Sequence, residues 1–328
     1  MVLYGYTSRN IPSPKVFENV LERRMKAKAN GDKATANALK LVVNTTYGAS
    51  LNQYNDLYDP LMGRSVCITG QLFLFELANH LYKSVEGLKI VQLNTDGIMV
   101  EFDDSQTGKV TEIVDEWQQR TGFELEEDKI QAIYQGNVNS YIEVQTNGTI
   151  KAKGGLLVRG ISTAGAFKIN NNAPIIPKAI QNYLVHGIEP EVTIGESTNI
   201  LDFQIIAKAS SKYSKCYQEV DGDLIEVQKC NRVYATEKPG YGTLYKRHAK
   251  TQAVVKVGGL PEKCLVDNDN TRSIEEIDRS WYEMMAWKYI RDFQGISYKV
   301  DRRKVNKIKE EILNMIGAKY GRQTSFNL

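Results

Sequence analysis

Three polar side chains recur at helical spacing within a short apolar stretch of the sequence. Lys40, Asn44 and Tyr47 are separated by four and three residues, so a helix would place them on one narrow stripe. Their neighbours at positions 39 and 41–43 are all apolar. A lysine and an asparagine on one face of an otherwise apolar helix are hard to explain as a solvated surface, and they suit a negatively charged ligand.

A second pair of cations lies one helix earlier in the sequence. Arg24 and Lys28 are four residues apart, which places them on the same face of a helix. Two facing helices that each present cations could clasp a group with several negative charges, such as a triphosphate. Taken alone, this pair is more simply explained as a solvated helix face.

Asp96 is the candidate metal ligand. The segments 89–93 and 98–102 contain β-branched residues and flank the run Asn94-Thr95-Asp96-Gly97, which predicts a β-hairpin with Asp96 at its tip. A hairpin tip presents a carboxylate at the edge of a sheet, where a metal ion could reach it. A lone aspartate in a turn is usually part of the turn itself, so its role depends on the other motifs.

The predicted elements position these residues. Helical periodicity predicts a hairpin of two helices, the first from Val16 to about 30 and the second from 33 to Tyr47, ending at Gly48. A loop at 60–64 follows, and then a largely apolar helix at 65–83 that we expect to be buried on several sides. Next we expect a helix at 107–120, strands within 123–160 with a turn at Asn147-Gly148, and a helix at 174–185. A Tyr-, Lys- and Gly-rich segment at 207–260 and a helical, basic C-terminus from about 274 complete the chain. The predicted fold class is α+β, with an antiparallel sheet.

The composition is that of a soluble globular protein. The 328 residues are 42% hydrophobic and 25% charged, which excludes the disordered and fibrous classes. No stretch reaches the ~18–20 apolar residues of a membrane helix, and the start lacks a signal-peptide pattern, so we expect a cytoplasmic protein with no membrane segment. The four cysteines, Cys67, Cys216, Cys230 and Cys264, form no CxxC motif and are expected to be reduced thiols.

Charge is distributed unevenly along the chain, although the net charge is only +3. Residues 1–50 carry a net charge of +5, residues 95–130 carry −8, and residues 286–328 carry +6. An acidic centre between basic ends fits a protein that binds a polyanion and holds a metal. Solvated helix faces explain the same pattern equally well.

The motifs resemble those of a known enzyme family. The run Lys-Leu-Val-Val-Asn-Thr-Thr-Tyr-Gly, from Lys40 to Gly48, resembles the KxxxNSxYG motif of the family B DNA polymerases. Arg24 and Lys28 match the RxxxK spacing of the preceding finger helix. The run Leu93-Asn94-Thr95-Asp96-Gly97 is similar to the palm hairpin motif of that family, usually Tyr-Gly-Asp-Thr-Asp-Ser. The resemblance extends through the chain and is nearest to bacteriophage polymerases.

The resemblance implies a right-hand polymerase architecture, with helical-hairpin fingers at 1–48, an antiparallel-sheet palm at 49–164 and a mostly helical thumb at 165–328. It implies a DNA-directed DNA polymerase of DNA replication, a nucleotidyltransferase that adds deoxynucleoside triphosphates to a primer 3′ end. Two Mg²⁺ ions would serve the reaction in the complete site. The partners would be primer–template DNA and deoxynucleoside triphosphates.

The same resemblance assigns residue roles. The nucleotide-binding residues would be Arg24, Lys28 and Lys40 for the triphosphate and Asn44 and Tyr47 for the nascent base pair. Asp96 would be the catalytic metal ligand. Tyr141 and Lys153, in segments similar to the palm, would contact primer or template DNA.

The residues themselves suggest further nucleic-acid contacts. Lys208, Lys212 and Tyr213 interleave cation and aromatic side chains, which suits a nucleic-acid backbone. A basic stretch at 302–309 could hold duplex phosphates without reading their sequence. An amphipathic helix end explains that stretch equally well.

Two departures from the family pattern limit the activity expected of the chain alone. Asn94 stands where the first palm aspartate usually is, and we expect that position to be auxiliary.

The first residues, Met1 to Tyr4, resemble the segment directly after the family's DxxSxYPS motif, which holds the other essential aspartate. The chain is therefore expected to lack that motif and the 3′–5′ exonuclease domain. One carboxylate cannot hold two Mg²⁺ ions, so a separate chain would supply the second. Asp103 and Asp104 are better explained as a solvated loop.

These observations support three hypotheses. The chain is the C-terminal part of a template-directed DNA polymerase that works with an upstream chain. It is alternatively a fragment that binds primer–template DNA without polymerising. The third hypothesis is an unrelated globular protein in which the motifs occur by chance. Primer extension and DNA binding distinguish all three.

Overall fold

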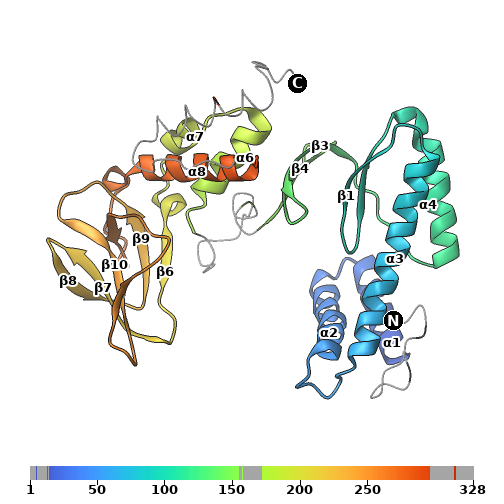
Figure 1. Ribbon diagram of the computed structural model, residues 1–328, viewed down its shortest axis with the longest axis horizontal. Coiled ribbons are helices and arrows are strands. Elements are labelled where there is room, and N and C mark those ends of the chain that lie inside the picture. The colour runs from blue at the N-terminus through green and yellow to red at the C-terminus, as the bar shows by residue number, and fades with distance from the viewer. Residues whose placement is uncertain are drawn as a thin grey trace. The chain divides into compact units, whose positions relative to one another are not determined.

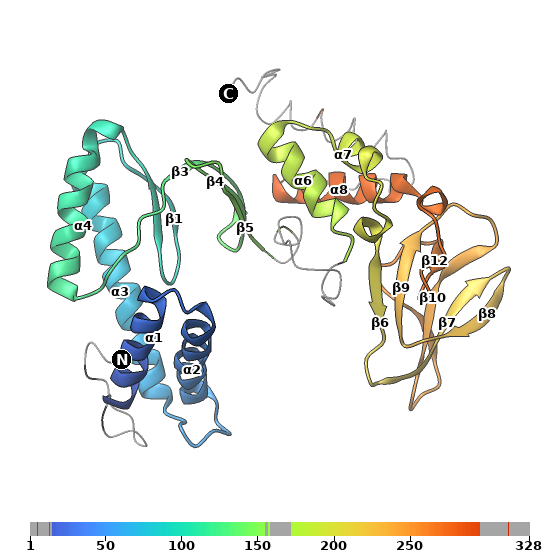
Figure 2. The same cartoon turned by 180° about the vertical axis from the view of Figure 1, so that it is seen from behind.

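The computed structural model describes residues 5, 13, 15–154, 157, 172–295 and 314 (Figure 1, Figure 2). Helices and strands are both abundant, which confirms the α+β class. The chain divides into two compact units, Met1–Glu127 and Asp128–Leu328, and each has its own hydrophobic core. The domain boundaries expected at 48 and 164 stay predictions.

The first unit opens with the predicted helical hairpin, drawn in blue in Figure 1. Helices α1 (Lys15–Ala29) and α2 (Lys33–Leu51) pack together across a short turn. Asp32 caps α2 by accepting a hydrogen bond from the backbone N–H of Thr35 at 3.0 Å. The hairpin is predictable because its periodicity and its turn residues are local signals.

Two helix boundaries differ from the prediction. Helix α2 passes through Gly48 and ends at Leu51, and Gly48 does not adopt the positive φ with which a glycine commonly ends a helix. Helix α3 (Pro60–Ser84) begins inside the predicted loop at 60–64. Asp59 caps α3 by accepting a hydrogen bond from the N–H of Met62 at 3.1 Å. Proline fits the first position of a helix, where its missing N–H is not needed.

Helix α3 buries one side only, contrary to the expectation of burial on several sides. Its buried residues are Met62, Gly63, Leu74, Leu77, Ala78 and Leu81. Its large exposed apolar side chains are Leu61, Ile68, Leu72, Phe75 and Tyr82. Among the residues that the structure describes, α3 is the one helix that is long and apolar enough to cross a membrane. This criterion considers only length and composition, and core helices of soluble proteins also meet it. The expected absence of a membrane segment stays a prediction.

The β-hairpin that carries Asp96 is confirmed. Strands β1 (Lys89–Leu93) and β2 (Ile98–Glu101) pair antiparallel. The short 3-10 helix η1 (Asp104–Gln106) follows, and then the predicted helix α4 (Thr107–Thr121).

A small core fixes this hairpin to α3 and α4. Leu77 and Leu81 of α3 pack with Ile113 and Trp117 of α4, and apolar residues of β2 cover them. The indole N–H of Trp117 donates to the carbonyl oxygen of Phe73 at 3.0 Å, which ties the two helices together. The Asp96 turn therefore projects from a packed base.

The second unit begins with a three-stranded antiparallel sheet in the order β3-β4-β5. Its strands are β3 (Ile130–Asn137), β4 (Ser140–Gln145) and β5 (Ile150–Lys153). The turn predicted at Asn147-Gly148 joins β4 to β5, and Gly148 adopts a φ of +79°, as such a turn requires.

Helices and two more sheets complete the second unit. The elements are α6 (Ile175–His186), α7 (Pro190–Glu196), η2 (Ile200–Phe203), β6 (Ile205–Lys208), β7 (Tyr213–Val220), β8 (Asp223–Val227), β9 (Cys230–Ala235), β10 (Tyr241–His248), β11 (Val254–Lys256), β12 (Cys264–Val266), η3 (Ile274–Glu276) and α8 (Arg279–Phe293). The sheet orders are β11-β10-β7-β8 and β12-β9-β6. The expected mostly helical thumb is wrong for residues 172–295, because β-branched and aromatic runs between turns form strands there.

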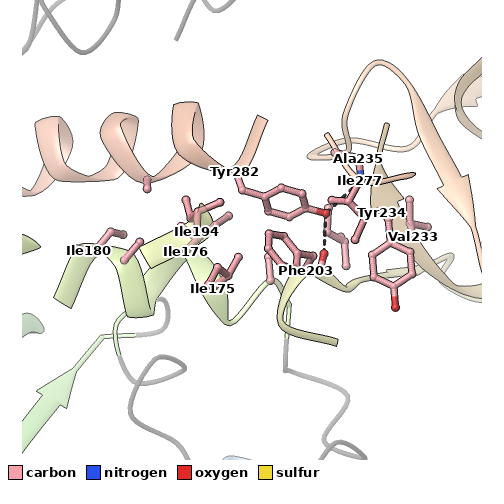
Figure 3. Packing of buried hydrophobic residues seen from close by; sticks show 14 of the residues in the cluster. Ile175, Ile176, Ile180, Ile194, Phe203, Val233, Tyr234, Ala235, Ile277 and Tyr282 are labelled. Atoms are coloured by element: carbon pink, nitrogen blue, oxygen red, sulfur yellow. Dashed lines mark hydrogen bonds between the residues drawn. The ribbon is translucent and has the colours of Figure 1, made fainter. Parts of the chain in front are cut away.

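The core of the second unit lies between α6, α7, α8 and the strands β6 and β9 (Figure 3). Tyr282 of α8 is fully buried, and its hydroxyl makes two hydrogen bonds. It donates to the carbonyl oxygen of Phe203 at 2.6 Å and accepts from the N–H of Ala235 at 3.1 Å. One side chain thus joins α8 to η2 and to β9.

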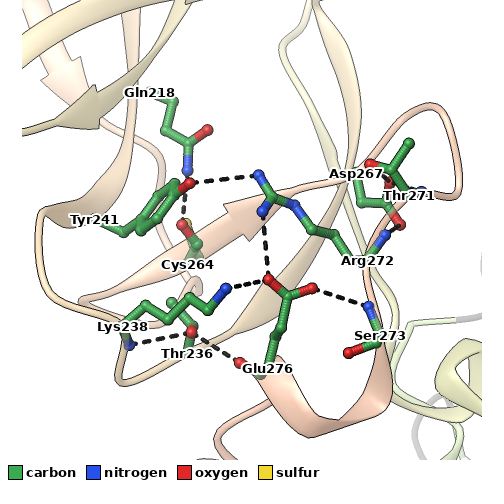
Figure 4. A network of polar contacts seen from close by, with 10 residues as sticks. All are labelled: Gln218, Thr236, Lys238, Tyr241, Cys264, Asp267, Thr271, Arg272, Ser273 and Glu276. Atoms are coloured by element: carbon green, nitrogen blue, oxygen red, sulfur yellow. Dashed lines mark hydrogen bonds and ion pairs between the residues drawn. The ribbon is translucent and has the colours of Figure 1, made fainter.

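A polar network fixes the connection that leads to α8 (Figure 4). Glu276 accepts from the N–H of Ser273 at 2.9 Å and pairs with Arg272 at 3.4 Å and with Lys238. Arg272 also donates to the hydroxyl of Tyr241 at 3.4 Å. Each of these side chains has a partner within the unit, although the Nε of Arg272 is buried without one, and we interpret the network as structural.

Candidate nucleotide and nucleic-acid site

The two residues of α1 predicted to bind a triphosphate lie in different surroundings. Arg24 is half-buried, whereas Lys28 is exposed. The Lys28 ammonium lies 2.7 Å from a carboxylate oxygen of Glu126, which follows α4. The side chains of Lys28 and Glu126 are both largely exposed, so this ion pair contributes little to the stability of the fold. A phosphate that arrives at α1 would compete with this carboxylate for Lys28.

The polar stripe on α2 is accessible. Lys40 and Asn44 are exposed, and Tyr47 is half-buried. Leu41 beside them is 65% exposed, so the apolar residues of α2 do not all face a core. The stripe is therefore a mixed apolar and cationic surface. Such a surface suits a ligand with a flat apolar part and a charged part.

Tyr47 is held by a cysteine that no motif in the sequence singles out. The hydroxyl of Tyr47 lies 2.7 Å from the sulfur of Cys67 on α3, at hydrogen-bond distance. This hydrogen bond, together with partial burial, raises the pKa of Tyr47 above its usual value. The contact joins two helices, and no local pattern around Cys67 predicts it.

Asp96 is exposed at the turn between β1 and β2, as predicted. The side-chain oxygen of Asn94 accepts the backbone N–H of Asp96 at 3.4 Å, and the N–H of Asn94 donates to the carbonyl of Gly97 at 3.0 Å. Asn94 thus shapes the turn with its side chain, in the manner of an Asx turn. This gives the position a structural role in place of a metal-binding charge.

Asp96 does not belong to a larger cluster of candidate metal ligands among the described residues. They contain no group of three or more His, Cys, Asp or Glu side chains that could hold a metal ion. Asp103 and Asp104 are exposed beyond β2, as expected for a solvated loop. Asp103 accepts from the N–H of Ser105 at 2.9 Å, and hydrogen bonds from Ser105 lower its pKa. The expectation that Asp96 holds Mg²⁺ together with a carboxylate of a separate chain stays a prediction.

The predicted contacts Tyr141 and Lys153 lie directly opposite each other on β4 and β5. The Lys153 ammonium is 5.8 Å from the centre of the Tyr141 ring, a cation–π distance. Gly154 follows with a φ of +112°, and a side chain there would meet Ser140 at 3.0 Å. Glycine therefore lets the two predicted segments approach closely.

The other predicted DNA contacts lie further along the second unit. Lys208 is exposed at the end of β6, an edge strand. Lys212 is exposed before β7, and its carbonyl accepts from the N–H of Ala249 at 2.8 Å. The basic stretch at 302–309 lies outside the described residues.

The structure places the residues predicted for nucleotide and metal binding in the first unit and those predicted for DNA contact in the second. In the part of the chain that is described, no hydrogen bond or ion pair joins Asp96 to α1 or α2. Comparison with protein-family models finds no match, and no curated protein matches the sequence.

Proposed function

We propose that this chain is the fingers and palm part of a template-directed DNA polymerase of the family B type. The observation that carries the proposal is the stripe of Lys40, Asn44 and Tyr47 on α2, in the same compact unit as Asp96. A nucleotide offers a charged triphosphate and a flat base. The stripe offers a cation, an amide and an aromatic ring in matching order.

The helical hairpin would position the nucleotide. Phosphoryl transfer depends mainly on alignment and on neutralising the charge of the phosphates. Lys40 on α2, and Arg24 and Lys28 on α1, would hold the triphosphate. Lys28 would exchange its contact with Glu126 for a contact with phosphate. Tyr47, oriented by Cys67, would pack against the base.

The proposal includes a second source of carboxylates. Asp96 alone does not complete a two-metal site among the described residues. We propose that a separate chain brings the second aspartate, together with an exonuclease, to the β1–β2 turn. The complete assembly would then bind Mg²⁺, primer–template DNA and deoxynucleoside triphosphates in the cytoplasm of the host of a phage.

A second candidate function is primer–template binding without polymerisation. The single carboxylate at the hairpin tip favours it, because every cationic residue proposed above could hold DNA without a catalytic metal. The two functions differ in whether a primer grows.

Primer extension with Mg²⁺ and four deoxynucleotides tests both functions on the full chain. The matched pair is Asp96→Asn and Asp104→Asn, two exposed carboxylates of the same unit. Extension by this chain alone that is lost only in Asp96→Asn supports the polymerase and contradicts the need for a separate chain. Primer–template binding without extension is expected both of the second function and of a polymerase that needs its separate chain, and nucleotide binding then distinguishes the two. Absence of both in the full chain contradicts both.

Nucleotide binding provides a second readout. We expect Lys40→Gln to weaken the binding of a fluorescent deoxynucleoside triphosphate roughly tenfold or more, because it removes a charged phosphate contact. Lys33→Gln, an exposed lysine of the same helix, is the control. An equal effect of the two substitutions would remove the support for a nucleotide site on α2.

A further inference from the structure

The four-stranded sheet of the second unit ends in a strand with a neighbour on one side only. Its order is β11-β10-β7-β8, so β8 (Asp223–Val227) is an edge strand that pairs with β7. Both views place β8 at the outer edge of this sheet (Figure 1, Figure 2). Within the described residues, no strand pairs with the other side of β8. We call that side the free edge of β8.

The hairpin that joins β7 to β8 determines which backbone groups point to the free edge. Val220 and Asp223 are partners on either side of a two-residue turn, and the pairing continues along β8 without a register shift. In such a hairpin the pair beside the turn shares hydrogen bonds, and hydrogen-bonded and non-hydrogen-bonded pairs alternate from there. The N–H and C=O groups of Leu224 and Glu226 therefore point away from β7, to the free edge.

The side chains of β8 do not protect this edge. Natural sheets commonly protect an edge strand with proline, with lysine or with a bulge. The sequence of β8, Asp-Leu-Ile-Glu-Val, has neither proline nor lysine, and its pairing with β7 has no bulge. Leu224 is 44% exposed and Ile225 is 52% exposed, on opposite faces of the strand. These features are typical of a strand that pairs with another strand.

The charges around β8 are separated between its two ends. Asp221 and Asp223 lie at its start and Lys229 follows its end, and all three are exposed. Within the described residues, none of the three makes an ion pair within 4.0 Å. Glu226, in contrast, pairs with Lys215 of β7. The strand therefore has an acidic end and a basic end whose charges have no counter-charge in their own unit.

A strand with opposite charges at its ends is complementary to an antiparallel copy of itself. When two such strands lie side by side, the acidic end of each one lies beside the basic end of the other. Two-fold symmetry produces this contact twice. The exposed apolar residues of the two strands meet between these charged ends.

The outward backbone groups limit the register of such a pair. Centring the two-fold axis on Ile225 pairs Leu224 of each copy with Glu226 of the other, so the outward groups of both strands gain partners. Ile225 then faces Ile225 of the second copy, at the close spacing of a non-hydrogen-bonded pair. Lys229 becomes a diagonal neighbour of Asp223, within reach of a long side chain. An axis centred on Glu226 would set that carboxylate against its own copy, which disfavours that register.

We propose that the free edge of β8 is a self-association surface, through which two copies of this chain join their four-stranded sheets into one continuous antiparallel sheet. Main-chain hydrogen bonds hold the two β8 strands together, and Ile225 lies at the two-fold axis. The contact is isologous, so it closes at two copies and does not build a filament. A strand of a different protein would use the same backbone groups, but the matching end charges single out a second copy of β8.

This surface goes beyond the proposed polymerase function, because it lies in the second unit and uses neither α2 nor Asp96. Asp96→Asn should leave the association unchanged, so a failure of the polymerase proposal does not decide this one. Because β8 is short, the pairing buries little area, and interfaces of small area are weak. We expect monomers and dimers to exchange, with the dimer becoming prominent at roughly hundred-micromolar protein.

Sedimentation equilibrium of the full chain at increasing concentration measures this association. The test variant is Ile225→Lys, which places a charge at the two-fold axis, as natural edge strands do. The matched control is Val254→Lys, at an exposed valine of β11, the opposite edge strand of the same sheet. Thermal unfolding of both variants shows whether each still folds like the parent chain.

We expect Ile225→Lys to weaken the dimer at least about tenfold, because two like charges replace an apolar contact. Val254→Lys should leave the dimer unchanged. An equal effect of the two substitutions overturns the proposal. A parent chain that stays monomeric up to the hundred-micromolar range also overturns it.

Exchanging the end charges tests the identity of the partner. Asp223→Lys and Lys229→Asp should each weaken the dimer roughly threefold or more, because each creates two repulsive contacts by symmetry. Combined in one chain, the two substitutions should restore most of the affinity, because the attraction returns with its direction reversed. A combined variant as weak as the single ones would overturn the charge matching that selects a second copy.

A cross-link at the two-fold axis tests the register. In a chain whose exposed cysteines, Cys67 and Cys230, are replaced by serine, Ile225→Cys should form a disulfide-linked dimer on mild oxidation. Leu224→Cys should not, because it faces Glu226 of the second copy. A cross-link through position 224 alone would overturn the register. Equal cross-linking at both positions, or none at either, would overturn the pairing itself, even if the charge variants misfold.

Discussion

At the scale of single residues, Tyr282 shows how one polar atom can hold several elements. Its ring fills the core, and its hydroxyl satisfies a carbonyl of η2 and an N–H of β9 that would otherwise be buried without partners. Burial raises the pKa of this hydroxyl well above its usual value, so it stays protonated and can donate. The side chain therefore combines packing with two specific hydrogen bonds.

Replacing Tyr282 by phenylalanine should lower the free energy of unfolding by about 1–3 kcal/mol. The ring still fills its space, but the carbonyl of Phe203 and the N–H of Ala235 lose their partner. Urea denaturation followed by tryptophan fluorescence measures the change. Tyr54→Phe, at a tyrosine that is 89% exposed, is the control. Equal midpoints for the two variants would contradict this explanation.

At the scale of elements, local signals predict well and distant pairings do not. The helical hairpin, the β1–β2 turn and α4 each follow from residues that are neighbours in the sequence. The start of α3 differs from the prediction because Pro60 is typical of loops, although Asp59 before it is a capping residue. Strands β6, β9 and β12 escape prediction because their partners lie far apart in the sequence. The β7–β8 hairpin does carry a local turn signal at Asp221-Gly222, which the expectation of a mostly helical segment overlooked.

The candidate site shows the same contrast between local signals, which predict positions, and distant contacts, which the sequence does not reveal. The stripe on α2 and the position of Asp96 are set by helical and hairpin periodicity, so the sequence predicts where they lie. The contact between Tyr47 and Cys67 depends on how α2 packs against α3, and periodicity carries no information about it. The free edge of β8 is equally hidden, because it depends on the order of the strands in the sheet.

The cap of α3 provides a prediction at the element scale. Asp59→Ala should lower the free energy of unfolding by about 1–2 kcal/mol, because the N–H of Met62 loses its buried acceptor. Asp59→Asn, which keeps an acceptor oxygen, should restore most of the loss. Urea denaturation followed by circular dichroism compares the three proteins. If asparagine is as harmful as alanine, the capping explanation is wrong.

At the scale of the whole molecule, buried ionisable groups link the stability of the second unit to pH. Burial raises the pKa of Cys264 to about 12, from an ordinary value of 9.0. Burial likewise raises the pKa of Tyr234 to about 12, from 10.0. Both groups are neutral when protonated, and the folded state binds these protons more tightly than the unfolded state does.

Alkaline conditions should therefore destabilise the protein. Below pH 9 both states keep the Cys264 proton, and stability does not depend on this group. Between pH 9 and 12 the unfolded thiol ionises first, so stability falls by up to about 1.4 kcal/mol per pH unit. Cys264→Ala should flatten the decline between about pH 9 and 10, as measured by urea midpoints. Cys230→Ala, at an exposed cysteine, should not. Parallel declines in both variants would contradict this assignment.

The hydrogen bond between Tyr47 and Cys67 also determines how the protein responds to thiol reagents. Cys216 and Cys264 are buried, whereas Cys67 and Cys230 are exposed. With Cys230 replaced, a maleimide dye would attach chiefly at Cys67, beside the stripe on α2. The dye would occupy the sulfur atom of Cys67 that the hydroxyl of Tyr47 contacts. Labelling should therefore break this hydrogen bond and release the side chain of Tyr47 from its orientation. The same atom is the first in this region that an oxidant would reach, which makes a reducing buffer a condition for keeping Tyr47 in place.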